Sequence, residues 1–289
     1  MKFILSRKGF DSSNGGIASP ILPDGTMLSL PIPVSGVSEE EGKKEYSYRY
    51  SDFEYNYNGH KLKYDEIISL LQGRTRRGFP YSFCHPDPAL RADMFSQKDG
   101  WTAAYGQCNG SQTHLINQGV EEGDIFLFFG MFRETEDNDE SVISFKRRSP
   151  AVHALYGYLQ IGEILTGDDI KNRVPYHPHA SDEHLGIYNN TVYLPSEELI
   201  IDGKGTGLKG YGTFKYDQEL VLSHSDKTRS KWKLFDWMHV ATISQHTRHH
   251  IHKDEKYFQS RTIGQEFVVS GSKEALKWAT AIILNHAER

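Results

Sequence analysis

The segment 124-DIFLFFGMFR-133 decides the fold class, because it is an almost unbroken apolar run preceded by Gly119 and Gly123. A second segment, 153-HALYGYLQIGEIL-165, has the same character, and the acidic stretch 134-ETEDNDES-141 lies between the two. Short apolar runs bounded by turn residues are typical of buried strands. The sequence therefore predicts a central pair of buried strands.

Shorter elements surround this pair. Apolar or alternating stretches predict further strands at 192-VYLP-195, 212-GTFKY-216, 219-ELVLS-223 and 266-EFVVS-270. Helices are predicted at 64-YDEIISLL-71, closed by Gly73, at residues 112–120 as a short helix or turn, and at 275–286 after an opening Ser272. We therefore expect an α+β fold that is strand-rich and mostly antiparallel, with a barrel-like core and a few peripheral helices.

Length and composition indicate one globular domain over residues 1–289. Residues 36–61 differ from the rest, being charged and tyrosine-rich, and are expected to form a surface ribbon or insertion. The net charge of −5 means that a nucleic acid would have to meet a local basic patch. No apolar run is long enough for a membrane span, and the two cysteines, Cys84 and Cys108, indicate free thiols, so we expect a cytoplasmic protein.

The opening stretch 6-SRKGFDSSNGG-16 gathers cations, a carboxylate and glycines after a short apolar run. One interpretation is a loop held by its own side-chain hydrogen bonds, which Asp, Ser and Asn often form. The other is an anion site, in which Arg7 or Lys8 binds phosphate and Asp11 acts as general base or holds a ribose hydroxyl. The spacing matches neither a P-loop nor a dinucleotide-binding turn.

Two later segments also concentrate polar chemistry. The segment 84-CHPDPALRADMF-95 offers His85 and Asp87 as an acid–base pair, or else a rigid surface loop. The segment 105-YGQCNGSQTHLINQG-119 is rich in amides, which can read base edges because they both donate and accept hydrogen bonds. Its alternative is a plain helix cap and loop, and Cys108 beside it is a further, weaker candidate for a nucleophile.

Histidines are numerous, with His177 and His179 around a proline and a second group at residues 246–252. Two or three of them could ligate a metal if the fold brings them together. Because neither spacing matches a local zinc motif, the sequence favours hydrogen-bonded or solvated histidines. We assign no metal and no cofactor from the sequence.

The order of these motifs along the chain resembles a family of bacterial and phage proteins, the third of the nucleotide modification associated domain families. The resemblance runs from residue 1 to about 270, and its first block is Arg7, Lys8, Gly9, Phe10 and Asp11. It implies an α+β enzyme of nucleotide or nucleic-acid modification, which could work with partner modification enzymes. Further matching positions are Asp87, Pro88, Gln107, His114, Gln118, Gly119, His177, His179, Gln265 and Glu266.

A second resemblance is local. The segments 123-GDIFLFFGMFR-133 and 153-HALYGYLQIGEI-164 are similar to the strand pair of PUA-like and EVE-like barrels, which bind modified bases or RNA. This supports an alternative function, a non-catalytic reader of modified bases. In that case Trp101, Tyr105 or Phe129 would stack on the base.

We therefore expect an enzyme that acts on a nucleotide, or on a single-stranded or flipped base. Catalysis is assigned to Asp11 as general base or nucleophile, with His114 and Asp87. Arg7, Lys8, Gln107 and Gln118 are expected to bind substrate. The family resemblance adds four more substrate-binding positions, His177, His179, Gln265 and Glu266.

Overall fold

The computed structural model describes residues 1–34, 48–57, 59–73, 81–95, 100–137, 143–262 and 264–288 of the chain. Its centre is the antiparallel pair of strands β8 (Ile125–Asp137) and β10 (Val152–Thr166). All side chains from Ile125 to Phe132 are buried, so both faces of β8 are covered. The strand pair that the two apolar segments predict is therefore confirmed.

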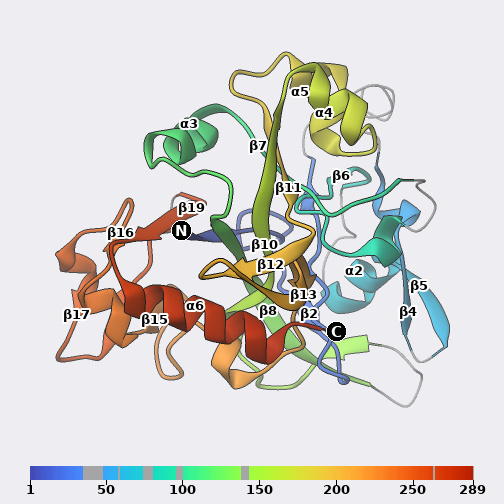
Figure 1. Ribbon diagram of the computed structural model, residues 1–289. Coiled ribbons are helices and arrows are strands. Elements are labelled where there is room, and N and C mark those ends of the chain that lie inside the picture. The colour runs from blue at the N-terminus through green and yellow to red at the C-terminus, as the bar shows by residue number, and fades with distance from the viewer. Residues whose placement is uncertain are drawn as a thin grey trace.

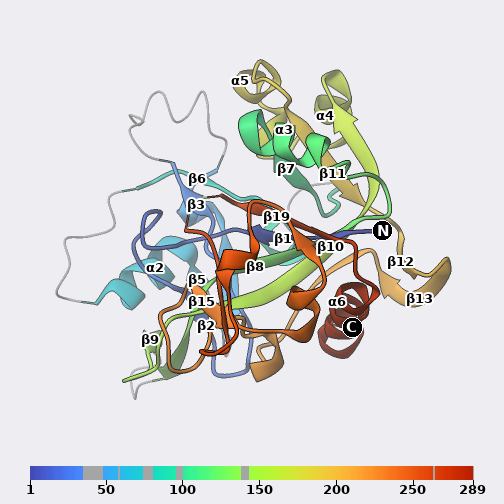
Figure 2. The same ribbon diagram turned by 90° about the vertical axis from the view of Figure 1, so that its left-hand side faces the viewer.

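Further strands extend the pair into a mixed sheet with the order β16-β19-β1-β8-β10-β11-β7, which is visible in Figures 1 and 2. Strands β1 (Phe3–Arg7) and β2 (Ser19–Ile21) lie parallel to β8, and the other pairings of this sheet are antiparallel. The remaining bounds are β7 Tyr105–Gln107, β9 Ile143–Phe145, β11 Thr191–Pro195, β14 Tyr211–Thr213, β16 Thr242–Ile243 and β19 Glu266–Ser270.

The barrel-like core was a wrong prediction. Among the described residues the terminal strands of the sheet, β16 and β7, do not pair with each other, and no closed barrel is detected. The apolar pattern of the strands predicts burial, but closure depends on tilt and stagger, which leave no local signal in the sequence. The broader prediction, a strand-rich and mostly antiparallel α+β fold, is confirmed.

The two faces of β8 are covered by different elements. On one face Phe126 and Phe128 pack against the ring of Tyr105, with ring centroids 4.7 and 5.2 Å apart. On the other face Phe129 meets Trp232 of β15 (Lys231–Lys233) at 5.1 Å. Helix α6 (Lys273–His286) buries Ala275, Ala279, Ile282 and Ile283 in the same core, and its N-cap Ser272 accepts a hydrogen bond from the amide of Ala275.

A second core lies around helix α2 (Tyr64–Gln72) and the hairpin β4 (Glu54–Tyr57) and β5 (His60–Lys63), at the right of Figure 1. The tyrosine-rich segment contributes to it, because Tyr48, Tyr50, Phe53 and Tyr57 are buried there. Residues 36–47 of that segment lie outside the described residues, as do residues 74–80.

Short elements complete the fold. Helices α3 (Asn109–Asn117), α4 (Asp168–Arg173) and α5 (Asp182–Leu185) lie at the same end of the molecule as β7 and β11 (Figures 1 and 2). No helix in the described ranges is long and apolar enough to cross a bilayer. The other strands are β3 Ile32–Pro33, β6 Cys84–His85, β12 Glu198–Ile201, β13 Lys204–Lys209, β17 Ile251–His252 and β18 Tyr257–Gln259. The 3-10 helices are η1 Tyr50–Asp52, η2 Ala92–Phe95, η3 Pro178–Ala180, η4 Gln218–Leu220, η5 Asp236–His239 and η6 Arg248–His250.

The predicted strand at 219–223 was also wrong. Its first residues belong to η4, because the Asp217 side chain accepts a hydrogen bond from the amide of Glu219 and starts a helical turn. A side chain that caps a turn competes with the neighbouring strand for hydrogen bonds to the backbone. The apolar residues that follow are buried, and Val221 makes only an isolated bridge to Ala154 of β10.

Candidate functional site

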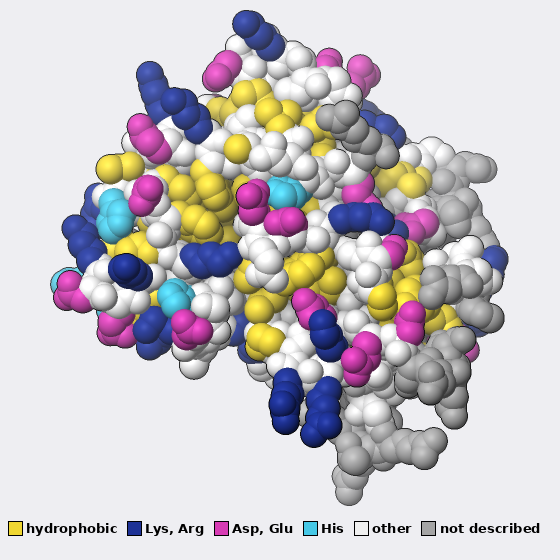
Figure 3. Space-filling model, turned by 90° about the horizontal axis from the view of Figure 1, so that it is seen from below, with side chains coloured by type: hydrophobic (Ala, Val, Ile, Leu, Met, Phe, Trp, Pro, Cys, Tyr) yellow, Lys and Arg dark blue, Asp and Glu magenta, His cyan; other side chains and the backbone are white. Residues whose placement is uncertain are grey.

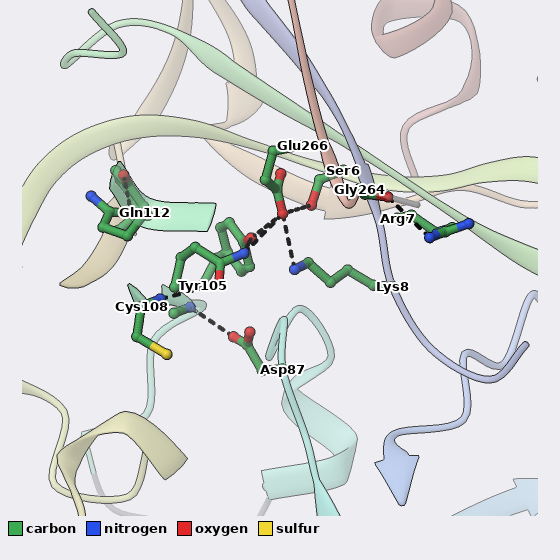
Figure 4. Close-up of polar contacts among 12 residues, drawn as sticks. Ser6, Arg7, Lys8, Asp87, Tyr105, Cys108, Gln112, Gly264 and Glu266 are labelled. Atoms are coloured by element: carbon green, nitrogen blue, oxygen red, sulfur yellow. Dashed lines mark hydrogen bonds and ion pairs between the residues drawn. The ribbon is translucent and has the colours of Figure 1, made fainter. Parts of the chain in front are cut away.

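Strands β1 and β19 bring three polar side chains to one face of the sheet. The register pairs Ser6 directly with Glu266, and directly paired residues share a face. Because side chains alternate along an extended chain, Lys8 lies on the same side as Ser6, while Arg7 points the other way. Figure 4 shows the Lys8 and Arg7 side chains running in opposite directions.

One carboxylate oxygen organises this face. Glu266 Oε1 accepts hydrogen bonds from Ser6 Oγ at 3.1 Å, Tyr105 Oη at 2.6 Å and Gln107 Nε2 at 3.0 Å, and it forms an ion pair with Lys8 Nζ at 3.1 Å (Figure 4). Glu266 is 1% exposed and Lys8 5%. The other oxygen, Oε2, is buried and has no hydrogen-bond partner among the described residues. We call Ser6, Lys8, Tyr105, Gln107 and Glu266 the Glu266 cluster.

Strand β7 supplies the second wall of this cluster. Its residues Tyr105 and Gln107 point to the Glu266 side, and the Gln107 amide nitrogen also donates to the Tyr105 hydroxyl at 2.9 Å. The Tyr105 ring is fixed by its packing on β8, and Lys8 Nζ lies 4.5 Å from its centroid. Burial and the neighbouring Glu266 carboxylate raise the pKa of Tyr105 far above its usual range, so the phenol keeps its proton.

A second buried carboxylate, Asp87, lies across β7 from Glu266. Its Oδ1 accepts hydrogen bonds from the Gly106 amide at 2.8 Å and from His177 Nε2 at 3.1 Å. Burial alone would raise the pKa of Asp87, but the His177 hydrogen bond and the nearby imidazoles outweigh it and hold that pKa at about 2. Asp87 is therefore an anion at neutral pH. Its partner is His177 rather than His85, the partner that the sequence suggests.

Three further imidazoles meet beside Asp87. His85 of β6, His179 of η3 and His184 of α5 each offer a ring nitrogen, and these nitrogens lie within 4.8 Å of one another. Their ring centroids are 4.9 to 5.4 Å apart. Burial lowers the pKa of His85 to about 4 and lowers the pKa of His179 well below its usual value, which keeps both rings neutral at pH 7.

Gly106 is required by this arrangement. A Cβ atom at position 106 would lie 2.3 Å from Cδ2 of His179, which no side chain can occupy while the ring stays in place. The backbone of β7 therefore separates the Glu266 cluster from the histidines by the thickness of one chain. Cys108 is half-buried and comes directly after the last residue of β7. Burial and the nearby Asp87 carboxylate raise the pKa of the Cys108 thiol, so the thiolate is disfavoured.

The remaining residues singled out from the sequence lie elsewhere. Asp11 Oδ1 accepts hydrogen bonds from the amides of Ser13 and Asn14, so its carboxylate closes the turn of its own loop. Arg7 donates to the carbonyl oxygens of Thr262 and Gly264, and His114 Nε2 is bonded to Ser244 Oγ at 3.0 Å.

Two amides of the sequence analysis are not part of the Glu266 cluster. Gln118 is exposed at the end of α3. The backbone carbonyl oxygen of Gln265 accepts a hydrogen bond from the backbone amide of Arg7. The aromatic rings proposed for base stacking also differ in exposure. Tyr105 and Phe129 are completely buried, whereas Trp101 is half-buried.

The profile of the family described as nucleotide modification associated domain 3 matches residues 2–270. The chain belongs to this family. The matched residues include both buried carboxylates, Asp87 and Glu266, and the histidines beside Asp87. No curated protein and no solved structure shows a significant match.

Several residues of this site were not predicted from the sequence. His184 carried no motif, Ser6 was quoted only as the first residue of the opening stretch without a role, and Tyr105 was considered only as a stacking aromatic. The alternation of side chains along an extended chain could have shown that Ser6 and Lys8 share one face and that Arg7 lies on the other. His184 had no such signal, because its position depends on how η3 and α5 fold back beside β6.

Proposed function

We propose that this chain is an enzyme that modifies a nucleotide or a base in nucleic acid, and that its active centre consists of the Glu266 cluster and Asp87. The observation that carries the proposal is the four-donor environment of Glu266 Oε1, assembled from β1, β7 and β19 around a buried ion pair. The family of the chain supports a role in nucleotide or nucleic-acid modification.

The energetics favour chemistry over stability as the reason for this cluster. A buried ion pair is often no more stabilising than apolar side chains of the same volume, because both charges lose their hydration. Clusters of buried titratable groups are therefore concentrated at functional sites. Glu266 Oε2 has no hydrogen-bond partner in the part of the chain that the structure describes, which adds a further cost that apolar packing would avoid.

The two carboxylates suit different tasks. In the proposed enzyme, Glu266 holds Lys8 and Tyr105 in place as hydrogen-bond donors. Asp87, whose pKa of about 2 keeps it ionised, stabilises positive charge that develops beside it. The Gln107 amide nitrogen supports both Glu266 and Tyr105 through its two hydrogen bonds. We assign no chemical step to Asp11, whose carboxylate is engaged in its own turn.

A basic groove supports a polyanionic substrate. This groove has a volume of about 360 Å³. The described residues that line it include one acidic side chain, Glu134, and six cationic ones, Lys146, Arg147, Arg148, Lys227, Arg229 and Lys233. The chain as a whole has a net charge of −5, so this cationic excess is local. On the face shown in Figure 3, side chains of both charge signs are interspersed. A local cationic groove can hold a phosphate backbone. Arg229 also donates a hydrogen bond to Ser12 Oγ, which places the loop of residues 6–16 beside the groove.

Nucleoside mass spectrometry tests the proposal. DNA and RNA from cells that express the wild-type chain are digested to nucleosides and compared with those from cells that lack it. We expect a new or missing nucleoside mass with the wild type, and its loss with Tyr105→Phe, which removes only the hydroxyl that contacts Glu266.

The matched control is Tyr193→Phe, which removes a buried hydroxyl bonded to Gln112 outside the cluster. This variant should keep the modification. An unchanged nucleoside profile with the wild type would contradict the enzymatic proposal. If the chain then bound modified oligonucleotides more tightly than unmodified ones, the alternative reader function would replace it.

A further inference from the structure

We propose that His85, His179 and His184 form a binding site for one divalent transition metal ion of the zinc type. The three residues come from three separate elements, β6, η3 and α5, and their candidate ligand nitrogens lie within 4.8 Å of one another. Imidazole nitrogen is a preferred ligand of zinc and of neighbouring transition metals.

The hydrogen bonds around His179 engage its Nδ1 nitrogen and leave Nε2 free. The Asn190 amide nitrogen donates to the His179 carbonyl at 2.9 Å, which fixes the orientation of the amide. Asn190 Oδ1 then faces His179 Nδ1 at 2.6 Å and can only accept, so Nδ1 carries the proton. The lone pair is left on Nε2. A hydrogen-bond acceptor on the second nitrogen is the usual support of a metal-binding histidine.

His184 and His85 are equally available. Ser181 Oγ lies 2.9 Å from His184 Nδ1 and can accept its proton, which leaves Nε2 of His184 for an ion. The His85 ring has no hydrogen bond among the described residues and packs between His179 and His184. His85 is half-buried and His179 is buried.

The electrostatic surroundings suit a cation. The Asp87 carboxylate lies close enough to interact electrostatically with all three rings. Lys8, which is paired with Glu266, is a nearby positive group. With Zn–N bonds of about 2.1 Å, a tetrahedral site has nitrogens about 3.4 Å apart, so the rings need only small inward rotations.

Three protein ligands leave a fourth position open, as in catalytic rather than structural zinc sites. An ion there would lie on the Asp87 side of β7, and it would polarise an oxygen or lower the pKa of a bound water. This role in the reaction rests on the proposed function. Metal binding itself does not, because it can be measured without any substrate.

The test uses the full chain, freed of metal with a chelator and then dialysed against zinc chloride or cobalt chloride. We expect one bound ion per chain by elemental analysis, and visible absorption from the cobalt form. His179→Ala and His184→Ala should each weaken binding at least about 100-fold, and Asn190→Ala about 10- to 100-fold through the lost support of His179.

His286→Ala is the matched control, because His286 belongs to an exposed group with Asp217 and Glu219 that offers similar ligand atoms at the surface. This variant should bind the ion like the wild type. Zinc should also raise the Tm of the wild type and of His286→Ala by about 5 °C. His184→Ala should melt like the metal-free wild type and show no such rise, which separates loss of the ligand from loss of the fold.

Two results would overturn the proposal. One is the absence of stoichiometric binding by the wild type. The other is binding that survives His184→Ala and is lost with His286→Ala. Stoichiometric metal without any change in the nucleosides would contradict only the proposed function, so the two failures can be distinguished.

Discussion

Replacing Lys8 by methionine should destabilise the protein strongly, because it leaves the Glu266 carboxylate buried without its cation. The charged atoms are 3.1 Å apart, and the two side chains are 5% and 1% exposed. At this separation two unit charges attract by about 5 kcal/mol for an effective dielectric constant of about 20. Three neutral donors remain on Glu266 Oε1, so we expect the lower end of the usual range, a loss of about 3 kcal/mol.

Urea unfolding of four proteins measures this effect: the wild type, Lys8→Met, Glu266→Gln and the double variant. Each single change should cost about 3 kcal/mol, since each leaves one buried charge unpaired. The double variant should lose less than either single change, because no lone charge remains. A loss of about 3 kcal/mol corresponds to a fall in Tm of about 6 °C in a chain of this size.

An exposed ion pair provides the control. Lys61 and Glu54 are 3.4 Å apart, but their side chains are 76% and 47% exposed. Lys61→Met should therefore cost less than about 1 kcal/mol. If the losses of Lys8→Met and Glu266→Gln add in the double variant to within about 0.5 kcal/mol, the two residues do not interact as a buried pair, and the reasoning is refuted.

Three further predictions concern other parts of the molecule. Burial lowers the pKa of His153 from 6.5 to about 3, so the folded state excludes a proton that the unfolded state binds, and stability falls as the pH drops from about 6.5 towards 3. His153→Gln should remove about 2 kcal/mol of the difference in unfolding free energy between pH 7 and pH 5, and an unchanged difference would contradict this. Gly106→Ala should cost about 1 to 3 kcal/mol in urea unfolding and weaken zinc binding, because its Cβ would displace the His179 ring; wild-type values would show that the contact is not tight. Arg147→Gln, in the basic groove, should reduce the salt dependence of single-stranded oligonucleotide binding by about 0.7 in the log–log slope, whereas Lys277→Gln on α6 should leave it unchanged; equal slopes for all three proteins would remove the groove from the binding surface.

The parts of the fold that could be predicted have a strong local signal. The run from Ile125 to Phe132 is apolar on both faces, and such a strand has to be central. The C-terminal helix has a serine cap and an apolar face. The strand at 219–223 failed because Asp217 caps a turn, and barrel closure failed because it depends on the whole sheet.

The candidate site shows the same limit. Lys8, Glu266, Asp87 and His177 were each identified in the sequence, but the pairs that they form were not. Those pairs join residues far apart in the chain, and only the register between β1 and β19 or the position of η3 brings them together. For Asp11 the sequence left two interpretations open, and its hydrogen bonds in the structure are those of the loop.

The most direct test of the account compares two isosteric changes, Asp87→Asn and Asp11→Asn, in the nucleoside assay. Asparagine can still accept the Gly106 and His177 hydrogen bonds at position 87, and it can still close the turn at position 11. We predict that Asp87→Asn abolishes the change in nucleoside mass and that Asp11→Asn keeps it. The reverse result, with activity lost at Asp11 and kept at Asp87, would contradict the placement of the active centre.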